Sequence, residues 1–269
     1  MIFTFILLRL IKNKKLFILN VLEINLIMVN VWRLGLMSYD TAMKIQLALA
    51  RKHLDAITKG QDGNFDTLLL VEHKPVFTVG IRDNTSNNEI SRLRELGADF
   101  KKTNRGGLIT FHGPGQLVAY PILNLKHFKT SVKWYVQSLE ETVINVCDEL
   151  GIKGSRSPYT GVWVQDNKIA AIGIHASRYV TTHGISLNCD NDLSWFNNID
   201  PCGIEDKGVT SLTKESGVEW SVEKVTPIFL KCFNKVFSCQ TEEIDVKTQE
   251  EILNSIYNNL LIQNLENMK

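Results

Sequence analysis

The segment that most constrains this chain is residues 105–116, RGGLITFHGPGQ, in which four glycines surround a short apolar run that ends in His112. Glycine tolerates positive φ angles and lets another group approach the backbone closely. Glycines on both sides of a strand therefore indicate main chain pressed against a ligand, with Arg105 and His112 supplying polar contacts at its edges. A glycine-punctuated hairpin without a ligand is the alternative, and this segment alone does not separate the two.

A second unusual segment contains a cysteine between proline and glycine, Pro201-Cys202-Gly203. Proline fixes one backbone torsion and glycine leaves space beside the sulfur, which suits a presented nucleophile. Cys147, by contrast, lies in an apolar stretch and is expected to be an inert buried thiol. Cys189 is the second candidate nucleophile because it belongs to the same segment as Cys202, but it lacks the proline–glycine setting.

Together these segments resemble the octanoyltransferases of lipoate biosynthesis, which move an octanoyl group from acyl carrier protein to a lysine of a lipoyl domain. The resemblance extends from about residue 31 to about residue 237 and is densest at residues 105–120, 158–188 and 192–212. Its longest shared pattern, RGGxxTFHxxGQxxxY in this chain, is too long for a chance match. Residues 158–163 and 188–189 are most similar to the mitochondrial branch of the family.

By position, the resemblance implies that Cys202 is the catalytic nucleophile, which takes the octanoyl group as a thioester, and that Lys168 is its partner. A free thiol has a pKa near ~8.5, so a neighbouring ammonium raises the thiolate fraction at neutral pH. Once the cysteine is acylated, a partly shielded lysine can lose its proton and act as a base toward the incoming amine. From the residues alone, Lys168 also fits a solvated lysine after a turn at Asp166-Asn167.

The resemblance also implies a set of acyl-binding positions, most of them small or aliphatic. Such side chains, with exposed backbone amides, can line a narrow apolar tunnel and hydrogen-bond a thioester carbonyl at its mouth. Serine stands at position 186, where we expect alanine in most relatives, and we interpret this difference as minor. We interpret His112 and His183 as shaping the site rather than transferring protons. The implied positions are Arg105, Gly106, Gly107, Leu108, Ile109, Thr110, Phe111, His112, Ala171, Ile172, Gly173, Gly184, Ile185 and Ser186.

Composition favours a soluble enzyme with one catalytic domain. The 269 residues, 44% apolar and 22% charged, suffice for one substantial core, and glycine-rich or proline-rich linkers are absent. A formal net charge of +1 gives no case for nucleic acid. Five cysteines without a C-x-x-C pair argue against a disulfide scaffold and a zinc site. We therefore expect a reducing compartment, with no metal and no cofactor.

The partners follow from the resemblance rather than from composition. It implies octanoyl-acyl carrier protein as the donor. The implied acceptors are the lipoyl domains of 2-oxo acid dehydrogenases and the glycine cleavage H protein. Because such partners are typically acidic, we expect a local basic patch on this chain.

The first 29 residues differ in kind from the rest. Apolar residues precede four basic residues, and the first acidic residue is Glu23, a pattern that favours import into the mitochondrial matrix. The stretch has no serine and is more apolar than most transit segments, so a translation start at Met28 is a second interpretation. Charges interrupt the apolar runs well short of the roughly 20 residues of a spanning helix, so no stable membrane insertion is expected. We expect residues 1–29 to lie outside a catalytic domain at 30–240, which a helical tail at 241–269 follows.

Apolar periodicity and turn signals predict helices at residues 39–58, 89–96, 131–150, 221–237 and 249–261. Strands are predicted at residues 67–72, 76–79, 108–111, 117–121, 162–164, 168–174 and 185–188. Because the hairpin connections are too short for parallel crossovers, we expect an α/β (α+β) domain with a mostly antiparallel or mixed sheet. The resemblance sharpens this expectation to the biotin/lipoate protein ligase-like catalytic domain.

Three functions of different kinds remain open. The first is an octanoyltransferase with a covalent cysteine. The second is an ATP-dependent lipoate or biotin protein ligase on the same fold; such ligases usually carry a third glycine in the first motif and no cysteine at this place. The third is a non-catalytic relative that binds acyl chains or lipoyl domains, against which the presence of both Cys202 and Lys168 argues. Since one fold can host all three, the choice depends on the site.

Overall fold

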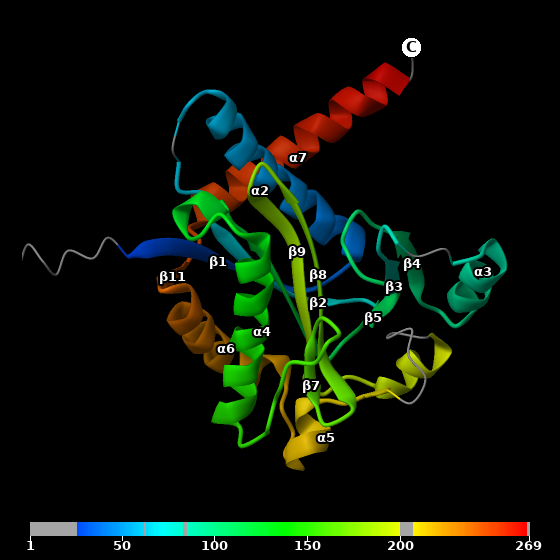
Figure 1. The fold of residues 1–269 in the computed structure, drawn as a ribbon. Helices are drawn as coiled ribbons and strands as arrows, with labels where there is room; N and C mark the ends of the chain where they lie inside the picture. Colours follow the sequence, from blue (N-terminus) through cyan, green and yellow to red (C-terminus); the bar gives the residue numbers. More distant parts are fainter. Residues whose placement is uncertain (1–25, 62, 83–84, 200–206, 268–269) are drawn as a thin grey trace, which may run out of the picture.

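The computed structural model describes residues 26–61, 63–82, 85–199 and 207–267 and contains a large mixed sheet with helices on both faces (Figure 1). The strand order is β10-β8-β9-β6-β2-β1-β11, and β7 pairs with β8. β1 runs parallel to β2 and β11, β10 runs parallel to β8, and the other neighbours are antiparallel, as expected for a mixed sheet. The strands are β1 (Ile27–Met37), β2 (Thr67–His73), β6 (Gln116–Ile122), β7 (Val162–Val164), β8 (Asn167–Ser177), β9 (Val180–Asn188), β10 (Gly208–Val209) and β11 (Cys239–Glu243).

The helices α4 (Val132–Glu149) and α6 (Val222–Phe237) cover one face of this sheet and lie side by side (Figure 1). Tyr135, Leu139 and Val143 recur at helical spacing along α4, and all three are fully buried. The Ser131 side chain accepts a hydrogen bond from the backbone amide of Trp134 and so caps the start of α4. The predicted helix at 131–150 is therefore confirmed to within one residue at each end.

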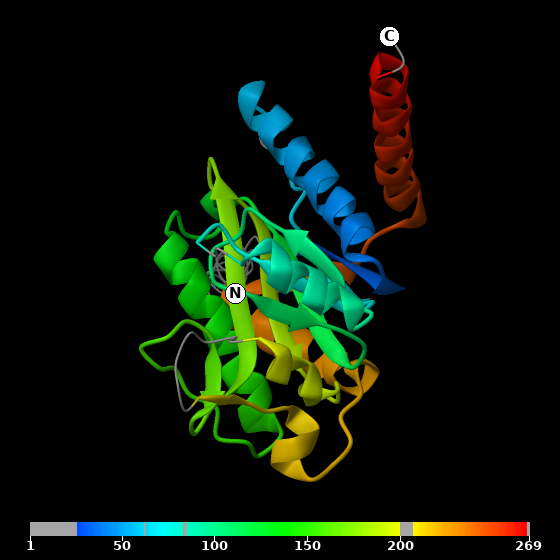
Figure 2. The same cartoon turned by 90° about the vertical axis from the view of Figure 1, so that its right-hand side faces the viewer.

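The helices α2 (Tyr39–Thr58) and α7 (Val246–Asn267) cover the other face, and α7 extends away from the body of the molecule (Figure 2). Ile45 and Leu49 of α2 pack in one cluster with Leu69 and Val71 of β2, because alternate residues of this strand face α2. Among the described helices, none has the length and apolarity that crossing a membrane requires.

A second sheet lies beside the first and has the order β4-β3-β5. Phe111 of β5 packs inside this unit and stacks on Trp195, with ring centroids 4.9 Å apart. The chain that enters β5 is fixed to the large sheet, since the Gly106 amide donates to the Ile174 carbonyl of β8 at 3.0 Å. The elements here are β3 (Val76–Val79), α3 (Asn87–Glu95), β4 (Asp99–Lys102), β5 (Thr110–His112) and the 3-10 helix η2 (Leu193–Asn198); η1 (Leu125–His127) and α5 (Leu212–Ser216) complete the fold.

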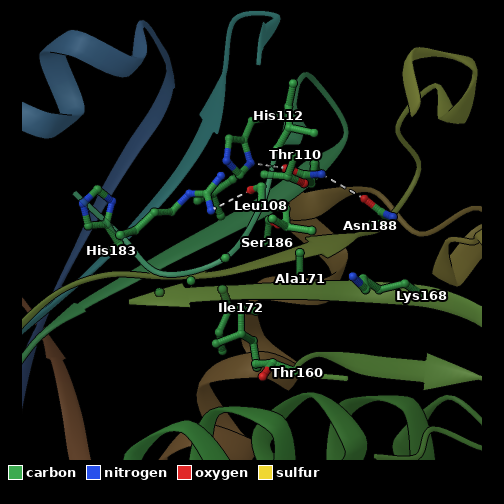
Figure 3. A pocket seen from close by; sticks show the side chains of 18 of the residues that line it. Leu108, Thr110, His112, Thr160, Lys168, Ala171, Ile172, His183, Ser186 and Asn188 are labelled. Carbon is green, nitrogen blue, oxygen red and sulfur yellow. Dashed lines mark hydrogen bonds between the residues drawn. The ribbon is translucent and has the colours of Figure 1, made fainter. Parts of the chain in front are cut away.

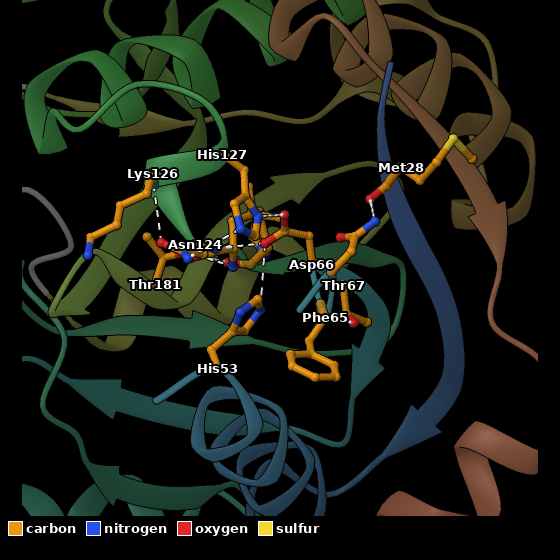
Figure 4. A network of polar contacts seen from close by, with 12 residues as sticks. Met28, His53, Phe65, Asp66, Thr67, Asn124, Lys126, His127 and Thr181 are labelled. Atoms are coloured by element: carbon orange, nitrogen blue, oxygen red, sulfur yellow. Dashed lines mark hydrogen bonds and ion pairs between the residues drawn. The ribbon is translucent and has the colours of Figure 1, made fainter. Parts of the chain in front are cut away.

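A buried polar network holds the end of the sheet opposite to β5 (Figure 4). The Asp66 carboxylate, fully buried, accepts from His127 Nδ1 at 2.5 Å and from the Asn124 amide at 2.7 Å. His53 of α2 lies 3.6 Å from the same carboxylate. The network therefore connects the start of β2 with the turn after β6 through one carboxylate, and His53 of α2 lies beside this carboxylate without a hydrogen bond to it.

Several elements differ from the prediction. The strands β1, β4, β10 and β11 were not predicted, and the hairpin of β8 and β9 extends to Ser177 and Val180, beyond the predicted strands. The expected domain limits at residues 30 and 240 fall inside β1 and β11, which pair with each other from Ile27 and Cys239 onward. The turn between β7 and β8 lies one residue earlier than predicted, with Gln165 at a φ of 52°.

Candidate active site

A pocket of about 360 Å³ lies between the large sheet and the glycine segment that leads into β5. Its floor consists of rows of side chains from β6, β9 and β8, because these strands are paired in register and alternate residues share a face. Lys168 and His183 lie at opposite ends of it, with Ala171 and Ile172 between them (Figure 3).

The middle row of the floor holds only modest side chains. Val118 of β6 pairs with Ser186 of β9, and Ser186 pairs with Ala171 of β8. Small side chains leave the sheet uncovered here, so the pocket reaches down to the strands. The hydroxyl of Ser186 is the one polar atom that these three side chains contribute to the row.

Arg105 organises the wall opposite the floor. Its guanidinium donates to the carbonyls of Gly106 and Leu108, at 2.9 and 3.0 Å. It also donates to the carbonyl and hydroxyl of Thr78, at 2.7 and 2.8 Å. Arg105 is 7% exposed, so these buried bonds hold the glycine segment in shape. Arg105 was expected to contact a ligand. In this structure its guanidinium instead binds carbonyl groups of the protein's own backbone and the Thr78 hydroxyl.

Two floor glycines are required by protein packing. A Cβ on Gly184 would lie 2.2 Å from the Ala119 carbonyl oxygen, and a Cβ on Gly173 would lie 2.8 Å from the Gly106 oxygen. These glycines face each other across β8 and β9. Their close approach is thus to neighbouring backbone, although both also line the pocket.

A directed chain of hydrogen bonds crosses the pocket wall near Lys168. Gln116 Oε1 accepts from His112 Nδ1 at 2.8 Å, which places the proton of this imidazole on Nδ1. Gln116 Nε2 donates to Asn188 Oδ1 at 2.9 Å, and Asn188 Nδ2 donates to the Thr210 carbonyl at 2.9 Å. Burial, and then the neighbouring His73 and Arg105, lower the pKa of His112 to about 3, so the ring is neutral. His112 thus positions other groups and does not carry a charge.

Lys168 occupies the end of the pocket where β10 joins the sheet. Its ammonium lies 4.9 Å from the centre of the Trp163 ring, a cation–π distance. Val209 pairs with Lys168, and the Thr210 amide donates to the Lys168 carbonyl at 3.0 Å. Phe196 and Val209, from the described chain on either side of residues 200–206, both line the pocket. Cys202 itself lies outside the described residues.

Three buried rings line the other end of the pocket, Tyr39 of α2, Tyr120 of β6 and His183 of β9, and a fourth, His73 of β2, packs against Tyr39 and Tyr120. We call these four rings the end cluster. The centroid of the His73 ring lies 5.4 Å from the Tyr39 ring centroid and 5.8 Å from that of Tyr120. The ring centroids of Tyr120 and His183 lie 6.5 Å apart. Burial lowers the pKa of His73 to about 4 and, together with Arg105, that of His183 to about 3. Both imidazoles are therefore neutral.

The catalytic-domain model of the lipoyl protein ligase A/B proteins matches residues 38–234. The chain belongs to this family. An octanoyl-[acyl-carrier-protein]:protein N-octanoyltransferase of Danio rerio, named as mitochondrial, is 56% identical over 207 residues, which make up 77% of this chain and 91% of that protein. An octanoyltransferase of Thermoanaerobacter sp. is 44% identical over 217 residues, 80% of this chain and 92% of that protein.

Solved structures of lipoyl protein ligases share the fold. A bi-partite lipoate protein ligase from Thermoplasma acidophilum superposes with a TM-score of 0.65 at 15% identity, over 86% of this chain and 92% of that one. Lipoate-protein ligase A bound with ATP superposes with a TM-score of 0.63 at 13% identity, over 86% and 93%. The predicted lipoate ligase-like fold class is therefore confirmed.

Within this lipoyl protein ligase A/B domain, most of the implied acyl-binding positions meet in the pocket, and two do not. Gly106 contributes its amide to β8, and the Phe111 side chain lies in the core of the small sheet. Tyr39, Val118, Tyr120 and several other pocket residues were not predicted, because the pairing of β6 with β9 and the packing of α2 on the sheet bring them to the pocket. Those implied positions that line the pocket are Arg105, Gly107, Leu108, Ile109, Thr110, His112, Ala171, Ile172, Gly173, Gly184, Ile185 and Ser186, with Lys168.

Described cysteines offer no exposed thiol. Cys147 and Cys189 are fully buried, and burial raises the pKa of each thiol to about 12. A thiol with so high a pKa is almost entirely protonated at neutral pH and is a poor nucleophile. This observation argues against Cys189, the second candidate from the sequence. In the described part of the chain, no three His, Cys, Asp or Glu side chains gather where a metal ion could bind.

Proposed function

We propose that this protein transfers an octanoyl group from octanoyl-acyl carrier protein to a lysine of lipoyl domains, through a thioester on Cys202. Octanoyl transfer in protein lipoylation is the activity that its relatives are named for, at 56% and 44% identity. The observation that carries the proposal here is the pocket, which has an ammonium at one end and small side chains along its middle. Such a pocket suits an acyl chain whose carbonyl lies beside Lys168.

The reaction proceeds in two acyl transfers. The Cys202 thiolate, which the Lys168 ammonium stabilises, attacks the donor thioester carbonyl, a new carbon–sulfur bond forms, and the carrier sulfur leaves as a thiolate that takes a proton from water. With the Cys202 thiolate consumed, the Lys168 ammonium releases its proton to solvent. The amine of the acceptor lysine then attacks the acyl-cysteine and gives its proton to Lys168, an amide forms, and the Cys202 sulfur leaves as a thiolate paired with the restored ammonium.

Two observations on the described chain around residues 200–206 support the pairing of Cys202 with Lys168. Phe196 and Val209 border the pocket and flank the stretch of chain that contains Cys202. Val209 and Thr210 are bound directly to the Lys168 backbone. The chain therefore leaves the pocket wall shortly before Cys202 and returns to Lys168 shortly after it.

The donor is an acyl carrier protein thioester and the acceptor a lipoyl-bearing protein. We propose the 2-oxo acid dehydrogenases and the glycine cleavage H protein as the acceptors, in the mitochondrial matrix. The mitochondrial name of the Danio rerio relative supports this compartment.

The test is the mass of the protein after incubation with octanoyl-acyl carrier protein without ATP. We expect one octanoyl adduct on a Cys202 peptide, which is discharged when a lipoyl domain is added. Cys202→Ser should give no adduct on that peptide. Cys189→Ser is the matched control and should acylate like the wild type, because its thiol is buried and protonated.

Other outcomes assign the protein differently. Transfer that requires ATP and leaves no acyl-enzyme would indicate a ligase, like the ATP-bound structural neighbour. An adduct on Cys189 would reverse the choice of nucleophile. Absence of both adduct and transfer, with octanoate still bound, would indicate a binding protein.

A further inference from the structure

The polar atoms of the end cluster are all used by the protein itself. His183 Nε2 donates to Asn104 Oδ1 at 2.8 Å, so its Nδ1 is the acceptor for the Tyr39 hydroxyl at 3.4 Å. Both ring nitrogens of His183 and the proton of the Tyr39 hydroxyl are therefore used within the protein, so this half of the cluster offers a ligand no free N–H or O–H donor.

The other half of the cluster is satisfied in the same way. His73 Nδ1 donates to the Met37 carbonyl at 3.3 Å, and its Nε2 accepts from the Tyr120 hydroxyl at 2.8 Å. His73 is fully buried and Tyr120 is 3% exposed. Each hydroxyl and ring nitrogen thus has a protein partner, so the cluster offers a ligand no free N–H or O–H donor.

The end cluster also has a fixed position. Its rings come from α2, β2, β6 and β9, so no single loop can carry it away. Gly184 and Gly173 come next to it on the floor, and both are packed against neighbouring backbone. The run of β8 from Lys168 to Gly173 spans roughly 16 Å. An acyl chain that begins beside Lys168 therefore meets a rigid stop at a set distance.

We propose that the end cluster limits the length of the acyl chain, and that Tyr39 is the residue that sets the limit. This inference rests on the proposed function. Tyr39 is the least firmly held ring, because its hydroxyl contact is the longest in the cluster, at 3.4 Å. It is also the first residue of α2, so a smaller side chain there lengthens the pocket without breaking a strand.

The experiment compares the rates at which the enzyme is acylated by octanoyl, decanoyl and dodecanoyl thioesters of acyl carrier protein. In the wild type, we expect decanoyl to react at least about 10-fold more slowly than octanoyl, since added methylenes meet the wall. In Tyr39→Ala, that gap should shrink to about 3-fold or less, since the removed ring leaves room for two methylenes. Tyr39→Phe keeps the ring, loses only the hydroxyl, and should keep the wild-type order of chain lengths.

A second variant tests the same limit from the middle of the pocket. Ala171 is half-buried and lies on the floor between Lys168 and the end cluster, so Ala171→Val should shift the preference toward hexanoyl. This variant leaves the end cluster intact and provides the measurement if Tyr39→Ala does not fold. A wild type that accepts no acyl group would overturn the proposed function. A wild type that accepts octanoyl, with the ratio of octanoyl to decanoyl rates unchanged in folded Tyr39→Ala and no shift toward hexanoyl in Ala171→Val, would overturn only the role of the end cluster.

Discussion

Single glycines decide how closely the strands of the pocket floor and the glycine segment can approach. Gly184 lies under the Ala119 carbonyl, and a methyl group there would be 2.2 Å from its oxygen. At Gly106, a methyl group would have no neighbour nearer than 3.8 Å. Two glycines that look alike in the sequence therefore differ in whether they tolerate an added methyl group.

We expect Gly184→Ala to lower the free energy of unfolding by about 3 kcal/mol or more, because the added carbon must push β6 and β9 apart. Gly106→Ala should change it by less than about 1 kcal/mol, since the methyl group finds ordinary contacts. Urea denaturation of both proteins measures the two values. Equal stability of the two variants would show that β6 and β9 move apart at little cost.

Lys168 is proposed to act once as a charge and once as a base, and two substitutions separate these roles. Lys168→Met removes both, so we expect acylation of Cys202 to slow by about 10²-fold at neutral pH and to recover partly as the pH rises. Lys168→Arg keeps the charge but cannot release a proton, so acylation should persist while transfer to the lipoyl domain fails. Rapid-quench mass measurements of both steps give the rates. Equal loss of both steps in Lys168→Arg would contradict a separate role as base.

At the scale of secondary-structure elements, the Asp66 network fastens the turn after β6 to the start of β2. Asp66→Ala leaves the buried Asn124 amide and His127 Nδ1 without this acceptor, and each such donor costs about 1–3 kcal/mol. Asp66→Asn keeps one oxygen for the Asn124 amide and should lose less. Thermal unfolding of both variants tests the order. If Asp66→Ala were more stable than the wild type, burial of the Asp66 carboxylate would destabilise the folded state by more than its hydrogen bonds stabilise it.

The elements that the sequence predicted well are those whose own residues show a period. The helices at residues 39–58 and 131–150 carry apolar residues at helical spacing and a serine cap, and the structure confirms both. The strands β4 (DFKK) and β11 (CQTEE) are polar edge strands in which apolar and polar residues do not alternate. Their own sequences therefore do not predict a strand. β1 was missed because its pairing with β2 and β11 is set by distant parts of the chain.

At the scale of the whole molecule, the sequence predicted the pocket's glycine segment, Lys168 and the part of the floor on β8 and β9, but not the part on β6. Ser186 and Ala171 were expected in the site, yet Val118 is joined to them only by the register of three strands. The end cluster takes one ring from each of four elements; Tyr39 belongs to no motif, and Tyr120, the last residue of the RGGxxTFHxxGQxxxY pattern, was not assigned to the site. Such groups become visible only when the sheet is assembled.

The same assembly buries three imidazoles in neutral form, which has a consequence for stability. Burial lowers the pKa of His73 to about 4 and the pKa values of His112 and His183 to about 3. In the unfolded chain each histidine takes up a proton near pH ~6.5. Between about pH 6.5 and pH 4 these three groups let the unfolded state bind up to about three more protons than the folded state, so stability falls as the pH falls. The buried His53, whose pKa burial also lowers, acts in the same direction.

We expect the free energy of unfolding to be nearly constant from pH 8 to pH 7 and to decline below about pH 6.5, approaching a slope of about 4 kcal/mol per pH unit near pH 5. Urea titrations at half-unit intervals measure this slope. His183→Gln removes one of the three protons and should reduce the slope by about one third, even though it weakens the protein at pH 8. A flat profile between pH 7 and pH 5 would mean that the folded state admits these protons, and hence that the closed end of the pocket opens to water in mild acid.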